Sequence, residues 1–344
     1  MDSHNQNKAL WWGLAGAGAL LAAQMLIHER RRIDFRGKTV VITGGSRGLG
    51  LVLARAFAKE GATLALCARD EAELQQAERD LRQYHDLVFT YVCDVTDKGQ
   101  VEAFINEVQQ KLGPIDVLIN NAGTITVTPY EHATEEDFRE ALDTHFWACY
   151  HTINAVLPQM RSRRAGRIVN ISSIGGKVAI PHLLPYAASK FALVGYSEGL
   201  RAELKKDGIY VTTVCPGLVR TGSPRNATFK GQNEKEYAWF KISDSLPLLT
   251  VSAETCAQEI LSACRYGKAE VIISVPAKVA AAFHGVFPGL TSDILSTVNT
   301  LLPEPGGIGS QRALGKDSET STSRSVLATL TDEAAERNNQ MAGS

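Results

Sequence analysis

Short apolar runs rich in β-branched residues alternate with helical segments along most of the 344-residue chain. The predicted strands cover residues 39–43, 63–67, 88–93, 117–120, 167–171, 210–214 and 271–274, and the predicted helices cover residues 49–59, 70–84, 98–112, 135–163 (one or two helices), 186–206 and 253–266. Strands that alternate with helices are joined by right-handed crossovers and form a parallel sheet covered on both faces. The alternation therefore predicts an α/β fold, a doubly wound parallel sheet of the Rossmann type, in a single domain over residues 37–275.

The first predicted strand runs into a glycine-rich turn, TGGSRGLG, over residues 43–50. Gly44, Gly48 and Gly50 let the turn tighten and let backbone N–H groups approach a pyrophosphate at the start of the next helix. A glycine-rich turn is a weak signal by itself, and a plain turn without a ligand is the alternative. Its place between a strand and a helix is what indicates a dinucleotide site.

Charge at the end of the second predicted strand indicates which dinucleotide binds. Folds that bind NAD usually place an acid there, which accepts a hydrogen bond from the ribose 2′-OH. Here Ala68 and Arg69 occupy that place, Asp70 is expected to start the helix, and Arg47 lies in the glycine-rich turn. Two cations at this corner would pair with a 2′-phosphate, which predicts NADP as the cofactor. The alternative is that both arginines are solvated surface charges.

Tyr186 and Lys190 are four residues apart, so on a helix they share one face. A phenol normally titrates near about 10, and a nearby ammonium together with a cationic nicotinamide would favour the phenolate. Tyr186 could then donate a proton to a carbonyl or accept one from an alcohol. Ser173 follows a predicted strand and could bond the same substrate oxygen. A Tyr–Lys pair at this spacing is common on helix faces and becomes specific only in company with the other motifs.

These residues, in this order, resemble the motifs of the classical short-chain dehydrogenase/reductase family over about residues 36–275. The segment Asn120-Asn121-Ala122-Gly123 is similar to the family's NNAG motif, which stabilises the central sheet and lies along the cofactor. Asp94 is similar to the acid placed near the adenine. The segment from Pro216 to Thr221 resembles the one that closes on the nicotinamide.

The resemblance implies three catalytic residues, Ser173, Tyr186 and Lys190, and no metal. Tyr186 and Lys190 would also contact the cofactor, and the other implied cofactor contacts are Gly44, Ser46, Arg47, Gly48, Leu49, Gly50, Arg69, Asp94, Val95, Asn121, Ala122, Gly123, Pro216, Gly217, Val219 and Thr221. One residue departs from the family: His145 stands where the family has an asparagine that helps hold a water beside the lysine. If that relay uses the backbone carbonyl, histidine can serve; if it uses the side chain, the relay is altered. The alternative is that His145 only packs inside its helix.

The N-terminus contains 19 residues without a charge, from Ala9 to Ile27. As a helix this segment would be about 28 Å long, close to the thickness of a bilayer core. Tryptophans stand at one end, and Arg30, Arg31 and Arg32 follow the other. The positive-inside rule then places the following domain in the cytoplasm, tethered by a single-pass transmembrane helix. The alternative is an apolar helix that lies on the protein surface or in a subunit interface.

The remaining segments complete the predicted domain organisation. A tail (1–8), the anchor (9–27) and a basic linker (28–36) precede the catalytic domain, and an apolar extension (276–303) interrupted by Pro288 follows it. Residues 223–249 have no clear period and fall where lids are common. Residues 304–344 are predicted to be mostly disordered, apart from a short helix over 326–337. The formal net charge of −1 gives no sign of a nucleic-acid protein. The six scattered cysteines predict buried free thiols rather than a zinc or disulfide framework.

The sequence thus predicts an NADP(H)-dependent oxidoreductase that transfers a hydride between nicotinamide and a carbonyl or secondary alcohol. The tether and the apolar extension favour a lipophilic substrate such as a steroid, a fatty acyl group or a long-chain ketone. The alternatives are a catalytically altered NADP-binding scaffold or sensor at a membrane, supported only by His145, and an epimerase or dehydratase of the same family. The resemblance also leads us to expect a homodimer.

Overall fold

Parallel strands form the centre of the molecule. The computed structural model describes residues 29–246, 249–321, 323 and 329–341. Its seven-stranded sheet has the order β11–β7–β6–β4–β1–β2–β3, and every neighbouring pair is parallel. The strands are β1 Thr39–Thr43, β2 Thr63–Ala68, β3 Val88–Val92, β4 Ile115–Asn120, β6 Gly166–Ile171, β7 Ile209–Pro216 and β11 Glu270–Ile273. The strand order reverses between β1 and β4, and ligands of such sheets bind at the carboxyl ends of the strands beside that reversal. The predicted Rossmann-type sheet is confirmed.

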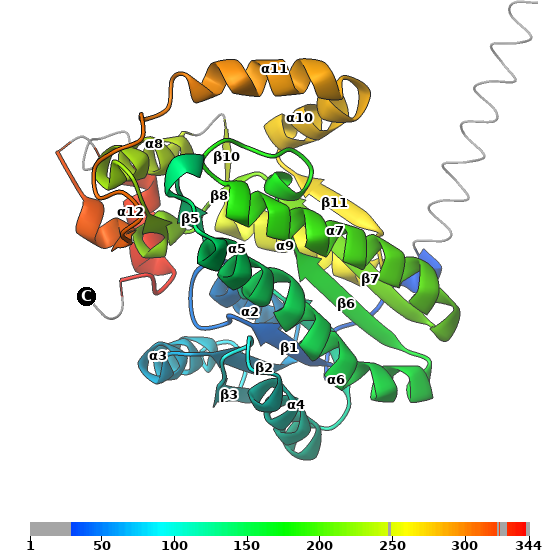
Figure 1. Cartoon of the computed structure of the whole chain (residues 1–344). Helices are drawn as coiled ribbons and strands as arrows, with labels where there is room; N and C mark the ends of the chain where they lie inside the picture. The colour runs from blue at the N-terminus through cyan, green and yellow to red at the C-terminus, as the bar shows by residue number, and fades with distance from the viewer. Residues whose placement is uncertain (1–28, 247–248, 322, 324–328, 342–344) are drawn as a thin grey trace, which may run out of the picture.

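Helices cover both faces of the sheet (Figure 1). One buried apolar cluster joins the sheet to α2 Gly48–Lys59, α3 Glu71–Leu81 and α9 Ala253–Arg265, and a second joins it to α4 Lys98–Leu112, α6 Ala148–Arg163 and α7 Leu184–Leu204. Asp70 caps α3, because its Oδ1 accepts a hydrogen bond from Glu73 N at 2.8 Å. Asp70 therefore starts the helix, as predicted.

The helical stretch predicted over residues 135–163 consists of two helices joined without a break. α5 Glu135–Leu142 runs into one π-helical turn, Asp143–Trp147, which continues as α6. A π-bulge of this kind inserts an extra residue into a helix and is frequent at functional sites. This turn carries His145, the residue that departs from the family pattern.

The segment over residues 223–249 is more regular than its sequence pattern indicates. It contains β9 Thr228–Phe229 and the helix α8 Asn233–Ser245. Glu236 and Lys241 are buried on α8, where Glu236 forms a hydrogen bond with His182 and Lys241 forms an ion pair with Asp332. Charged residues at buried positions break the apolar period, which explains why the sequence did not indicate this helix.

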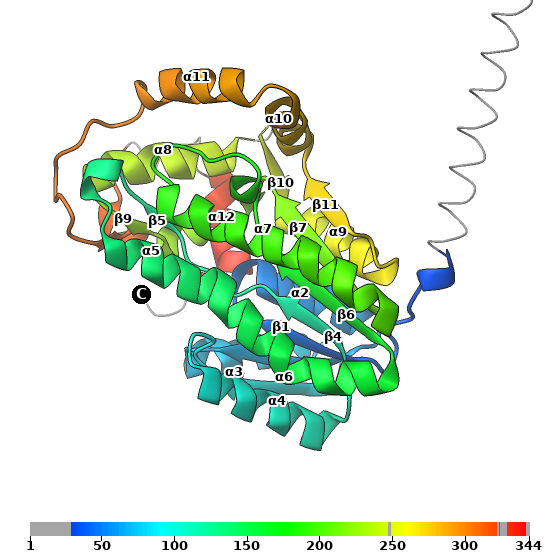
Figure 2. The ribbon, with the colours of Figure 1, turned by 45° about the vertical axis from the view of Figure 1, so that its right-hand side comes forward.

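The C-terminal tail is the clearest correction to the sequence prediction. Residues 304–344 were expected to be mostly disordered, yet their described part packs against the domain (Figure 2). β12 Ala313–Leu314 pairs with β9, which in turn pairs with β5 Thr126–Val127. Arg312 Nη2 donates a hydrogen bond to Asp137 Oδ1 at 2.7 Å, and α12 Thr329–Arg337 packs against α8. Polar contacts rather than an apolar period hold this tail, so its composition resembles that of a disordered segment.

Two short helices form the apolar extension. α10 Val275–Val286 and α11 Pro288–Asn299 are separated at Phe287, so the apolar extension is interrupted next to Pro288, as the sequence predicts, and Pro288 starts the second helix. Their exposed apolar side chains are those of Val275, Val279, Val286, Phe287, Leu290, Ile294 and Val298, and Leu301 follows them. Among the described residues, no helix combines the length and apolar character needed to cross a bilayer. The anchor predicted over residues 9–27 lies outside those residues.

All six cysteines are buried and unpaired, as predicted. Cys67, Cys93 and Cys149 belong to the apolar cluster on the α4–α6–α7 face, and Cys256 and Cys264 belong to the one on the α2–α9 face. Burial raises the pKa of Cys256 and of Cys264 to about 12. These thiols are therefore inert apolar groups of the core.

Candidate active site

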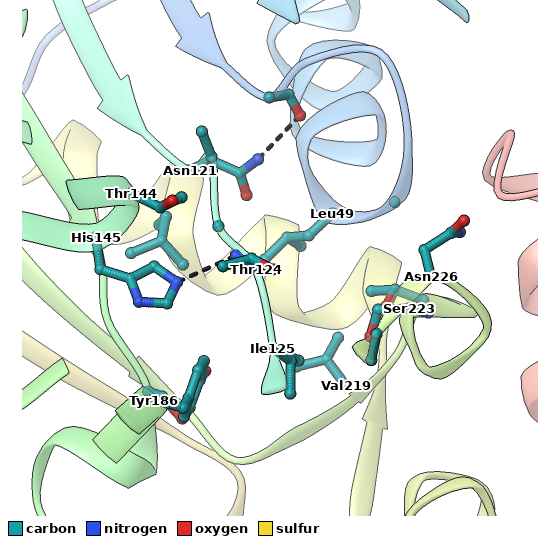
Figure 3. Close-up of a pocket in the computed structure, with 18 of the residues that line it drawn as sticks. Leu49, Asn121, Thr124, Ile125, Thr144, His145, Tyr186, Val219, Ser223 and Asn226 are labelled. Carbon is teal, nitrogen blue, oxygen red and sulfur yellow. Dashed lines mark hydrogen bonds between the residues drawn. The ribbon is translucent and has the colours of Figure 1, made fainter. Parts of the chain in front are cut away.

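A cavity of about 670 Å³ lies at the carboxyl ends of the strands. It is lined by every residue that the sequence predicted for the cofactor or for catalysis, with the exception of Gly50. Figure 3 shows part of this lining, with Leu49 and Asn121 near the glycine-rich turn and His145 and Tyr186 on the side of α7. A volume of this size is within the range of cofactor and ligand sites.

The glycine-rich turn has the geometry that a dinucleotide needs. Gly44 and Gly48 have φ angles of 62° and 55°, which side chains with a Cβ rarely adopt. A Cβ at Gly50 would overlap the carbonyl oxygen of Gly44, so Gly50 is needed for close packing rather than for lining the cavity. Asn121 fixes the turn, because its Nδ2 donates to the carbonyls of Thr43 and Gly44, each at 3.1 Å. The residues present therefore fit the pyrophosphate of a dinucleotide at the start of α2.

The corner beside the second strand holds one acid that sequence reasoning missed. Glu73 is buried on α3, and its carboxylate accepts from Ser46 Oγ at 2.9 Å and pairs with Arg47 Nη1 at 2.5 Å. Arg69 lines the same part of the cavity. Arg47 is thus held in place rather than freely solvated. Glu73 gives no sequence signal, because it falls within a helix where acids are ordinary.

The predicted catalytic residues come together at the other end of the cavity. Tyr186 and Lys190 lie one turn apart near the start of α7, and Ser173 follows β6. Burial raises the pKa of Tyr186 above its usual value, and a hydrogen bond with Ser173 opposes that shift. Lys190 Nζ donates to the carbonyl of Ile171 at 2.9 Å, and burial lowers its pKa to about 8. The protein alone therefore keeps Tyr186 protonated, the state of a proton donor.

Residues 38–230 match the family described as short chain dehydrogenase. This chain is a short-chain dehydrogenase. It is 32% identical over 289 residues to dehydrogenase/reductase SDR family member 7B of Danio rerio, over 81% of this chain and 91% of that protein. It is 36% identical to 3-dehydrosphinganine reductase of Danio rerio over 189 residues, 54% of this chain and 57% of that protein.

The structure of L-sorbose reductase from Gluconobacter frateurii, in complex with NADPH and L-sorbose, is similar to this one with a TM-score of 0.62. Its sequence is 27% identical, and the similarity covers 70% of this chain and 97% of that one. Membership of the family makes the chain an oxidoreductase that acts on CH–OH or C=O groups.

His145, the departure from the pattern of short-chain dehydrogenases, is buried and hydrogen-bonded on both ring nitrogens. Ser189 Oγ donates to the carbonyl of Tyr186, so it accepts from His145 Nδ1 at 2.7 Å. His145 Nε2 then accepts from Thr124 N at 3.2 Å (Figure 3). Burial and the charge of Lys190 hold the pKa of His145 well below its usual value. A neutral ring satisfies both partners, so His145 does more than pack: it joins the loop after β4 to the helix of Tyr186.

The part of the cavity near Tyr186 is largely apolar. Sequence reasoning missed the side chains that line it, which are Ile125, Ile174, Ile180, Leu183, Ala227 and Phe240. Ile125 follows the NNAG motif closely, and that position could have suggested it. Phe240 belongs to the unpredicted helix α8, so no sequence signal pointed to it.

Proposed function

We propose that this short-chain dehydrogenase is an NADP(H)-dependent oxidoreductase of a lipophilic carbonyl or secondary alcohol. The observation that carries the proposal is the meeting of Ser173, Tyr186 and Lys190 in one cavity with the glycine-rich turn. NADP(H), when bound, supplies or removes the hydride at the substrate carbon. Tyr186 donates its phenolic proton to the carbonyl oxygen, which becomes the hydroxyl, and Ser173 holds that oxygen in place.

The preference for NADP(H) is supported by the charges at the phosphate corner. Arg47 and Arg69 are the cations there, and Ala68 replaces the acid that commonly binds the ribose of NAD. Glu73 already holds Arg47 in the cavity wall, so little side-chain entropy is lost when a phosphate binds. L-sorbose reductase, a structural neighbour whose sequence is 27% identical to this chain, binds NADPH.

Replacement of the two arginines tests this preference. The double variant Arg47→Ala/Arg69→Ala should weaken the binding of NADPH by about tenfold or more per residue, since a charged hydrogen bond is worth about 1.5–3 kcal/mol. The binding of NADH should weaken far less. The measurement is KM for each cofactor. Arg79→Ala, an exposed change on α3 outside the cavity, is the matched control. An unchanged ratio of the two KM values in the double variant would contradict the NADP(H) assignment.

The lipophilic substrate is supported by the apolar lining near Tyr186 and by the exposed apolar side chains of α10 and α11. The apolar segment over residues 9–27 supports the proposal of a membrane location, and by the positive-inside rule the arginines after it favour a catalytic domain on the cytoplasmic side. One relative, 3-dehydrosphinganine reductase, is named for a lipid substrate. A homodimer stays a prediction from the family resemblance.

A series of methyl ketones of increasing chain length tests the reaction. With NADPH, kcat/KM should rise roughly three- to fourfold for each CH₂ that the cavity buries, since each is worth about 0.8 kcal/mol. The measurement is the loss of NADPH absorbance with each ketone. Binding of NADPH without turnover of any ketone, alcohol or lipid extract would favour the scaffold alternative. Equal kcat/KM along the series would contradict the lipophilic substrate.

A further inference from the structure

The end of the chain lies directly on the glycine-rich turn. Gly48 N, at the first residue of α2, donates to the carbonyl of Asn338 at 2.8 Å. Asn339 Nδ2 donates to the carbonyl of Ser46 at 2.9 Å and to that of Glu73 at 3.2 Å. One side chain near the C-terminus thereby joins the glycine-rich turn to the first turn of α3, the two sides of the phosphate corner.

Two further residues of the domain hold this tail in place. Arg55 on α2 donates to the carbonyl of Arg337 at 2.9 Å and to Asn338 Oδ1 at 3.2 Å. Asn226, on the opposite side of the cavity, donates to Gln340 Oε1 at 2.6 Å. Asn338, Asn339 and Gln340 are at most 5% exposed. The tail is therefore anchored on both sides of the cavity opening rather than resting on the surface.

The domain leaves room for the tail at two glycines with positive φ angles. A Cβ at Gly48 would lie 2.5 Å from Gln340 Nε2, and one at Gly222 would overlap Ala335 Cα. Gln340 also lines the cavity beside the glycine-rich turn. The absence of a side chain at Gly48 thus makes room for the tail beside the glycine-rich turn.

We infer that the C-terminal tail, through Gln340, forms part of the wall of the cofactor site and that Asn339 is a positioning residue for the dinucleotide. The inference rests on the proposed function only in taking a nicotinamide dinucleotide as the ligand. Asn339 acts through the carbonyls of Ser46 and Glu73, which set the spacing between the turn and α3. Two side-chain atoms at this place, Asn338 Nδ2 and Asn339 Oδ1, are buried and have no hydrogen-bond partner among the described residues.

Coupling between tail and cofactor follows from this arrangement. If the docked tail favours the dinucleotide, the bound dinucleotide must favour the docked tail by the same factor. No hydrogen bond or ion pair joins Tyr186 or Lys190 to the part of the tail that the structure describes, so kcat at saturating cofactor should change little. A defect confined to cofactor binding is therefore the mark of a positioning role, whereas general destabilisation would lower every parameter.

The substitution Asn339→Gly in the full chain tests the inference cleanly. Asn339 has a φ angle of 58°, which glycine adopts without strain, so the change removes the amide and keeps the backbone. The loss of two hydrogen bonds should raise the Kd for NADPH about tenfold or more in a fluorescence titration, and kcat should stay within about twofold of the wild type. Asn299→Gly, the same change at an exposed position on α11, is the matched control and should leave the Kd unchanged.

A second measurement needs no variant. Trypsin cleavage of the wild type after Arg337, whose side chain is exposed, should slow several-fold when NADPH is added. Equal cleavage rates with and without NADPH, or an unchanged Kd in Asn339→Gly, would overturn the inference while the proposed function stands. A wild type that binds neither NADPH nor NADH would overturn both.

Discussion

Tyr186 and Lys190 share a helix face, and the protein surrounds both with apolar and backbone groups. From the sequence we expected the lysine to lower the pKa of the phenol. In the protein alone, burial raises the pKa of Tyr186 and lowers that of Lys190. The spacing predicted which residues meet, but it could not predict their burial, because the walls around them come from distant segments. The oxidised nicotinamide is a second cation that would favour the phenolate, and the protein itself does not supply it.

Removal of the phenolic hydroxyl tests the role of Tyr186. Tyr186→Phe keeps the ring and removes the proton donor, so kcat should fall by about 10²–10⁴-fold. NADPH affinity, measured by fluorescence titration, should change little. Tyr84→Phe, at an exposed tyrosine between α3 and β3 that does not line the cavity, is the control. Near wild-type turnover by Tyr186→Phe would sink the assignment.

Lys190 should set the alkaline limit of activity. With its pKa lowered to about 8, it is charged below that pH and loses its charge as the pH rises through it. Because the pKa of Tyr186 is raised above its usual value, the deprotonation of Lys190 should be the first titration to lower activity as the pH rises. The measurement is kcat/KM for the cofactor against pH, which reports the free enzyme and should fall above about pH 8. Lys190→Arg should move the fall to higher pH if any activity is kept. A flat profile to pH 10 would contradict this role.

At the scale of elements, the π-helical turn between α5 and α6 sets the position of His145. Its neutral ring receives the N–H of Thr124 and donates to Ser189. His145→Ala would leave the partly buried N–H of Thr124 without its partner and open a small cavity, so the free energy of unfolding should fall by about 2–4 kcal/mol. The measurement is urea denaturation followed by circular dichroism.

His85→Ala is the control for that prediction. His85 Nδ1 also accepts from a backbone N–H, that of Leu87 at 3.1 Å, but at an exposed turn where water can replace it. Its loss should cost at most about 1 kcal/mol. Equal effects of the two substitutions would mean that His145 has no special structural role.

The elements that the sequence predicted are those with an apolar period. The strands of the main sheet and α4 begin and end within about two residues of their predicted positions, because buried side chains there are apolar. The short helix predicted over residues 326–337 is present as α12. α8 and the packing of the C-terminal tail on the domain escaped prediction because their buried contacts are ionic or amide contacts, such as those of Lys241 and Asn339. In the same region Lys230 and Asp137 form a buried ion pair at 2.5 Å between distant segments. Only the folded chain shows which charges are paired.

At the scale of the whole molecule, the predicted tether should govern location without governing the fold. The buried core begins at Phe35, so deletion of residues 1–28 should leave a domain that still binds NADPH. It should appear in the soluble fraction, and Leu20→Arg/Leu21→Arg should act likewise, since each charge at the centre of a membrane helix costs about 2.5–3.5 kcal/mol.

Fractionation with a carbonate wash measures this effect. The wash also removes protein held only by the exposed apolar side chains of α10 and α11, and so separates the two kinds of attachment. Full-length protein in the soluble fraction, or a catalytic domain protected from protease on the non-cytoplasmic side, would contradict the tether.

The six buried thiols can report where the folded protein unfolds locally. A thiol reagent reaches them only when the surrounding layer separates, so the rate of labelling reports a local unfolding equilibrium. Cys67, Cys93 and Cys149 report one helical layer, and Cys256 and Cys264 report the other. Mass spectrometry of partially labelled protein would therefore tell which side of the sheet gives way first. Under oxidative stress, the same arrangement would spare the folded enzyme and mark only those copies that have already begun to come apart.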